Sequence, residues 1–85
     1  MSVVVDARGL RCPLPVIRLA AAARDAAPGT DITVIWTDPA ARHDIPAWAR
    51  MRGHEVRATA PLAPPDAAPG PDGPDAFATT VRTAG

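Results

Sequence analysis

The sequence predicts an α/β (α+β) two-layer sandwich of order βαβαββ, with both helices packed on one face of a four-stranded mixed sheet. The chain has 85 residues, which is long enough for one domain and too short for two. Hydrophobic residues make up 47% of it, which is typical of a folded globule. Segments of strand and helix periodicity follow one another in the order strand, helix, strand, helix, strand, strand. We therefore expect residues 1–85 to form a single domain.

The first half of the chain predicts two strands separated by a helix. Residues 2–5 are a short β-branched run ending at Asp6, which is typical of a buried strand. A helix is expected to open at Cys12-Pro13-Leu14-Pro15, because the fixed φ of proline suits a first helical turn, and to continue to about Ala26. Residues 31–36 alternate as the second strand. The apolar side of the helix is expected to contain Leu14, Val16, Ile17, Leu19, Ala20, Ala21 and Ala23.

A second helix is predicted to begin near His43-Asp44. Asp44 is a candidate for its N-cap, and Pro46 falls in the expected first turn. Gly53 stands where a left-handed C-cap glycine is expected. The residues expected on the buried face are Ile45, Trp48, Ala49 and Met51.

Two further strands are predicted on either side of a proline-rich segment. Residues 54–60 alternate, with Val56 and Ala58 expected on one face, and residues 75–82 form a closing strand. Residues 61–74 hold six of the eleven prolines and show no apolar period, so we expect a mobile, partly extended loop there. The alternating residues of the closing strand are Phe77, Thr79 and Val81.

Charge and cysteine content exclude several classes of function. Nine arginines balance nine acidic residues, and this zero net charge argues against a nucleic-acid partner held by charge. Lysine is absent, so Schiff-base chemistry and a P-loop lysine are excluded. One cysteine and two histidines do not suffice for an internal disulfide or a metal site, so neither a metal nor a cofactor is expected. No signal-like start and no membrane-length apolar run is present, so we expect a cytoplasmic protein without a membrane partner.

The single cysteine, Cys12, is the candidate reactive group. It precedes the predicted first helix, where unpaired amides such as those of Leu14 and Val16 favour negative charge. The positive charges of Arg8 and Arg11 are expected to add to this effect and to stabilise a thiolate or persulfide. A lone cysteine is, however, often an inert buried hydrophobe.

The surroundings of Cys12 favour group transfer over hydrolysis. His43 and His54 are placed near the ends of the second helix, so neither is an obvious base for the thiol. No second cysteine is present to resolve a disulfide, which argues against thioredoxin-like chemistry. Asp6 and Asp38 each end a strand and are expected to cap backbone amides.

Two separated blocks resemble the TusA/SirA-like sulfur-carrier family. The run from Asp6 to Pro15, DARGLRCPLP, is similar to the family signature of an Asp, a Gly-Leu pair and Cys-Pro-x-Pro at a helix start. The likeness covers residues 3–60 and 75–82, including Phe77 and Val81 of the last strand. The second block consists of Asp38-Pro39-Ala40, Asp44-Ile45-Pro46 and Gly53-His54.

The resemblance implies a two-layer βαβαββ fold and a carrier of sulfane sulfur, rather than a multiple-turnover enzyme with its own substrate pocket. Cys12 would hold the persulfide, and Asp6, Gly9, Leu10, Pro13 and Pro15 would shape the loop around it. The partners would be a cysteine desulfurase or rhodanese-type donor and a downstream acceptor protein. The arginines that either form a docking surface or simply face solvent are Arg8, Arg11, Arg18, Arg42 and Arg50.

Several alternatives stay open on the sequence alone. The sulfur could serve tRNA thiolation, molybdenum-cofactor maturation or sulfur oxidation. A second interpretation is a regulatory or RNA-binding module of the same fold, against which the zero net charge counts. A third is a scaffold subunit whose thiol is incidental.

Overall fold

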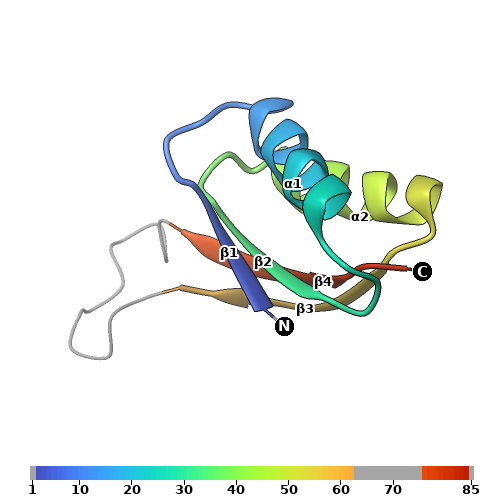
Figure 1. Cartoon of the computed structure of the whole chain (residues 1–85). Helices are drawn as coiled ribbons and strands as arrows, with labels where there is room; N and C mark the ends of the chain where they lie inside the picture. The colour runs from blue at the N-terminus through green and yellow to red at the C-terminus, as the bar shows by residue number, and fades with distance from the viewer. Residues whose placement is uncertain (1, 63–75, 85) are drawn as a thin grey trace.

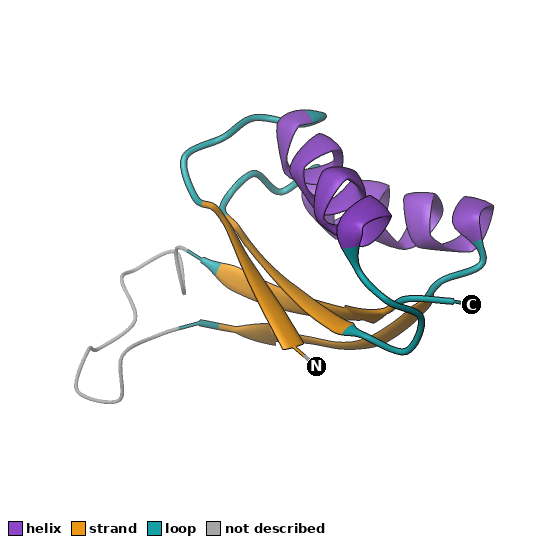
Figure 2. Cartoon of the chain, viewed as in Figure 1, coloured by secondary structure: helices purple, strands orange, loops and turns teal. Residues whose placement is uncertain are grey.

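A computed structural model describes residues 2–62 and 76–84, and the six predicted elements occur in the predicted order. The sheet has the strand order β1-β2-β4-β3, in which β1 and β2 are parallel and the other two pairs are antiparallel. Both helices cover the same face of this sheet (Figure 1; Figure 2), so the predicted two-layer sandwich is confirmed. The strands are β1 (Ser2–Ala7), β2 (Asp31–Trp36), β3 (Glu55–Pro61) and β4 (Phe77–Arg82), and the helices are α1 (Leu14–Asp25) and α2 (Ala41–Arg52).

The core lies between the sheet and the two helices. Alternate residues of β2 are fully buried, as a strand with one covered face requires, and the antiparallel register places residues of the same face of β4 opposite them. The facing pairs are Ile32 with Val81, Val34 with Thr79 and Trp36 with Phe77. The hydroxyl of buried Thr79 accepts a hydrogen bond from the Trp36 Nε1–H at 2.9 Å, so the core contains no unpaired polar group at this position.

The first strand is less buried than the sequence predicts. β1 is an edge strand, and only one of its faces meets the helices. Val3 and Val5 are partly buried on that face, whereas Val4 is 68% exposed on the other. A run of β-branched residues therefore indicates a strand here but does not decide how deeply the strand is buried.

The apolar side of α1 is also narrower than predicted. Pro15 and Leu19 are its buried residues, while Leu14 is 46% exposed and Ile17 is 55% exposed. Ala21, placed on the apolar side, is exposed as well. Apolar residues surround most of this helix, but only one stripe of a helix can face the layer beneath it.

α2 begins at Ala41, two residues before the predicted start, and Asp44 is not its N-cap. Asp44 lies in the first turn, and the cap position belongs to Ala40, whose side chain forms no capping hydrogen bond. Met51 is 80% exposed, so its predicted burial is wrong. Gly53 ends the helix with φ of 76°, which confirms the predicted left-handed C-cap.

A β-bulge at Arg57 separates two residues that were expected on one face of β3. Val56 pairs with Val81 on the covered face, whereas Ala58 pairs with Thr80 on the open face. The extra residue reverses the alternation, which is the usual effect of a bulge. Pro61 still belongs to β3, where it pairs with Phe77, and the rest of the predicted proline-rich loop, from residue 63 on, lies outside the described residues. Within the described part of the chain, no helix is both long and apolar enough to cross a membrane.

Candidate functional site at Cys12

The thiol lies in the turn that joins β1 to α1. Cys12 is two residues ahead of Leu14, the first residue of α1, and the Cys12–Pro13 peptide bond is cis. Its side chain is partly buried and packs against the hydrophobic core. The sulfur is therefore close to a helix start and is not enclosed in the interior.

The turn is held in place by two side chains from the loop after β2. The Gly9 N–H donates to Thr37 Oγ1 at 2.9 Å, and the Cys12 N–H donates to Asp38 Oδ2 at 2.8 Å. The other carboxylate oxygen of Asp38 accepts from the Ala40 N–H at 3.0 Å. Because β1 and β2 are parallel, the loops that follow them meet at one edge of the sheet. One carboxylate thus connects the cysteine turn to the start of α2, and the prediction that Asp38 caps backbone amides is confirmed.

The hydrogen bonds to Asp38 also set its protonation. The amides of Cys12 and Ala40 favour the charged form, so the pKa of Asp38 lies below the ordinary aspartate value of 3.8. A carboxyl whose pKa is lower in the folded state supports folding above its unfolded pKa, and this support is lost as the pH falls. The connection between the two loops is therefore complete at neutral pH.

The electrostatic surroundings of the thiol are opposite to the sequence-based expectation. Burial raises the pKa of the Cys12 thiol most. A hydrogen bond to Asp44 and the negative charges of Asp44 and Asp38 raise this pKa further, from 9.0 to about 11 in total. The Leu14 amide, expected to be unpaired, donates to the Arg11 carbonyl at 2.8 Å. The expectation that the surroundings stabilise the Cys12 thiolate is therefore wrong, because burial, and after it the carboxylates of Asp44 and Asp38, favour the protonated thiol.

The guanidinium of Arg8, which was expected to act on Cys12, forms an ion pair with Asp6 in its own turn. Its Nη2 lies 2.8 Å from Asp6 Oδ2, and its Nε–H donates to Asp6 Oδ1 at 3.0 Å. Hydrogen bonds from Arg8 lower the pKa of Asp6 to about 2. Gly9 follows with φ of 79°, a left-handed conformation that glycine adopts at little cost. Asp6, Arg8 and Gly9 together form the turn that leads the chain from β1 towards Cys12.

The other predicted loop residues lie around this turn. Leu10 is partly buried against the core, and Pro15 is buried in the first turn of α1. Pro13 is the exposed residue at the N-cap position. Arg11 is exposed, and its charge is one of the causes that lower the pKa of Asp38.

The remaining arginines of the predicted docking set are exposed and spread over both helices. Arg18 lies on α1 and Arg50 on α2. Arg42 lies over the stacked rings of Phe77 and Trp36. Its guanidinium carbon is 5.0 Å from the Phe77 ring centroid and 5.8 Å from the Trp36 ring centroid. The charges that act on the thiol are those of Asp44 and Asp38 rather than these arginines.

Two residues of the site, Thr37 and Asp44, were not predicted from the sequence as part of it. Thr37 directly follows β2 and supplies the acceptor for Gly9, while Asp44 was assigned to capping. The signal that could have found them is the parallel pairing of β1 and β2, which brings the residues after each strand together. No group of three or more His, Cys, Asp or Glu side chains suited to a metal ion occurs in residues 2–62 and 76–84.

Replacing Asp38 with Ala should loosen the cysteine turn. The amides of Cys12 and Ala40 would both lose their acceptor, so we expect their hydrogen exchange to accelerate on the order of tenfold or more. Asp38→Asn keeps one acceptor oxygen and should release only one of the two amides. Asp25→Ala, at the far end of α1, is the matched control and should change neither. Unchanged exchange at Cys12 in Asp38→Ala would contradict the assignment.

The fold and the site define a class of small α/β sandwich proteins that present one cysteine ahead of the first helix. Comparison with known proteins specifies the family: the model of the family described as sulfurtransferase TusA matches residues 3–61, and the chain belongs to this family. Sulfur carrier protein TusA from Pseudomonas aeruginosa is 49% identical over 53 residues, which cover 62% of this chain and 67% of that protein. The protein of the same name from Pseudomonas putida is 47% identical, with coverages of 62% and 66%.

A solved structure supports the fold independently. A SirA-like protein from Desulfitobacterium hafniense superposes with a TM-score of 0.67, covering 98% of this chain and 99% of its own. Its sequence is 23% identical, so this likeness concerns the fold alone. The predicted TusA/SirA-like membership is confirmed.

Proposed function

We propose that this protein is a sulfur carrier in which Cys12 accepts a sulfane sulfur as a persulfide and passes it to an acceptor protein. Its family and the names of its relatives support the general role. The observation that carries the proposal is the position of the only cysteine, partly exposed in a turn fixed by Asp38 at the start of α1. A thiol held in this way can meet a second protein without a substrate cavity of its own.

The transfer is balanced without an added oxidant. The sulfur of Cys12 attacks the outer sulfur of a donor persulfide, a new S–S bond forms, and the S–S bond within the donor breaks. The donor leaves as a thiolate and takes up the proton that Cys12 loses. In the second step an acceptor thiol attacks the outer sulfur of the Cys12 persulfide, and Cys12 returns to its thiol form.

Within this proposal the donor is a cysteine desulfurase or a rhodanese-type protein, and the acceptor is a second protein. The raised pKa of Cys12 means that the free protein holds little thiolate at neutral pH. A cationic group of the donor, placed near Asp44 and Asp38, would lower this pKa in the complex. The carrier would then react mainly when docked, which suits a relay that must not lose its sulfur to solvent thiols.

Intact-mass analysis after incubation with a cysteine desulfurase and cysteine tests the proposal. The wild-type chain should gain one sulfur atom, removable by a reductant, whereas Cys12→Ser should gain none. A relocated thiol, Cys12→Ser combined with Ala21→Cys on the exposed side of α1, controls for general thiol reactivity and should label at least about tenfold more slowly. Equal labelling of Cys12→Ser, or no sulfur gain from either a desulfurase or a rhodanese-type donor with thiosulfate, would refute the carrier role.

A further inference from the structure

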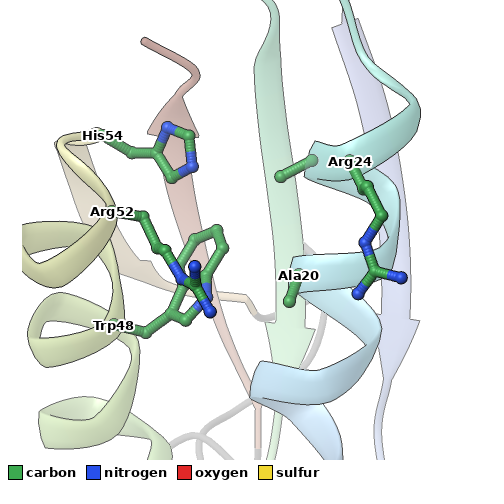
Figure 3. Close-up of a pocket in the computed structure, with 6 residues that line it drawn as sticks. Ala20, Arg24, Trp48, Arg52 and His54 are labelled. Atoms are coloured by element: carbon green, nitrogen blue, oxygen red, sulfur yellow. The ribbon is translucent and has the colours of Figure 1, made fainter.

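A cleft between the C-terminal halves of α1 and α2 lies away from the cysteine turn, which is at the N-terminal ends of both helices. It has a volume of about 420 Å³, within the roughly 300–1,000 Å³ that small-molecule sites occupy. Figure 3 shows Ala20 and Arg24 on the α1 side, with Trp48, Arg52 and His54 on the α2 side. Ala23 completes the lining. The small side chains of α1 leave the cleft open next to a large aromatic surface.

The aromatic part of the cleft is arranged by contacts that the fold itself provides. The rings of Trp48 and His54 lie with centroids 4.9 Å apart and their planes inclined by 37°. The Nδ1 of His54 accepts a hydrogen bond from the Ala84 N–H at 3.0 Å, so the neutral ring carries its proton on Nε2. The imidazole is thus fixed as a donor beside the indole, and both rings come from the α2 side of the cleft.

The charge of the cleft is positive. Its two ionised side chains are the arginines, one from each helix, and no acidic residue lines it. Among residues 2–62 and 76–84, neither Arg24 nor Arg52 forms an ion pair, whereas Arg8, Arg57 and Arg82 each do. Arginines in a last helical turn also stabilise the helix end, but that role requires neither the aromatic pair nor the open space between the helices.

We propose that this cleft binds a small aromatic anion of the mononucleotide class. The planar ring would pack against Trp48, and the negative group would be held by the guanidinium of Arg52, with Arg24 on the α1 side adding positive charge at the rim of the cleft. A small molecule fits better than a nucleic-acid strand, because the chain has no net positive charge and the cleft is confined to the space between two helices. The site involves none of the residues around Cys12, so it stands independently of the sulfur-carrier proposal.

Titration of the 15N-labelled protein with adenosine monophosphate, adenosine and inorganic phosphate tests the site. The indole Nε1–H of Trp48 should shift on addition of adenosine monophosphate, while that of Trp36, buried and bonded to Thr79, is an internal reference that should not. We expect saturable binding at millimolar concentration or below, and affinities for adenosine and phosphate alone that are at least about fivefold weaker. Cys12→Ser should bind as the wild type does.

Variants of the arginines distinguish a specific binding site from non-specific attraction of an anion to positive charge. Arg52→Ala should weaken binding at least about fivefold and Arg24→Ala by a smaller factor, while Arg18→Ala, which removes an exposed arginine elsewhere on α1, should leave binding unchanged. Three results would overturn the proposal: absence of saturable binding in the millimolar range, phosphate binding as tightly as the nucleotide, or equal loss in Arg18→Ala and Arg52→Ala.

Discussion

Replacing Asp44 with Asn should make Cys12 a more reactive thiol at neutral pH. Burial raises the pKa of Cys12 most, and the hydrogen bond and charge of Asp44, together with the charge of Asp38, raise it further, to about 11. Removing the charge lowers the pKa. Each tenfold gain in thiolate is accompanied by a roughly threefold loss of intrinsic nucleophilicity, so the net rate gain is roughly threefold for each unit by which the pKa falls.

The measurement is the rate of alkylation by iodoacetamide between neutral pH and pH 11. In the wild type the raised pKa keeps the thiol protonated below about 11, so the rate should rise steadily with pH and show no plateau near 9.0. In Asp44→Asn the curve should move to lower pH. Asp25→Asn, in the last turn of α1, is the matched control and should follow the wild type. A wild-type plateau at or below the ordinary thiol pKa would contradict this account of the site.

The same shift predicts that stability falls in alkali. A group whose pKa is higher in the folded state than in the unfolded state binds its proton more tightly when folded. For Cys12 the favourable contribution is fully present below pH 9.0 and is lost as the pH rises towards about 11. Asp44→Asn should weaken this alkaline dependence.

Trp36→Ala should remove most of the stability of the domain. The indole is 1% exposed, stacks on Phe77 with centroids 4.8 Å apart, and donates to Thr79 at 2.9 Å. Truncating a buried aromatic side chain costs about 3–5 kcal/mol, and whole domains are stable by only about 5–15 kcal/mol. For a single thin core this loss approaches the total.

Urea unfolding monitored by circular dichroism provides the measurement. Trp36→Phe is the matched variant, since it keeps an aromatic ring for stacking on Phe77 and loses the indole donor, and we expect it to cost about 1–3 kcal/mol. Thr79 would still have Thr59, whose hydroxyl lies 3.0 Å away, as a hydrogen-bond partner. A loss below about 1 kcal/mol in Trp36→Ala would show that the stacked pair is not central to the core.

Local chemistry explains why the element order could be predicted. The alternation of residues 31–36 gave the bounds of β2 as they are found, and Gly53 marked the end of α2. These signals depend on the residues themselves: side-chain period, and the conformational freedom of glycine at a left-handed position. The beginning of α2 was missed because its cap position holds Ala40, which has no capping side chain, and the nearby carboxylate of Asp38 binds the amide of Ala40 itself.

The candidate site was only half predictable. The sequence determined the candidate nucleophile, because the chain offers a single cysteine, and its place ahead of a helix, because prolines follow it. The tertiary structure decided the protonation of that cysteine, because Asp38 and Asp44 reach the thiol from residues 26 and 32 positions further along the chain (12 to 38 and 12 to 44). It also decided which valine of β1 is exposed and which face of α1 is buried, since both depend on what packs against them. The side-chain type fixes the chemistry a residue can perform, but the charges and burial that tune it come from segments brought together only by the fold.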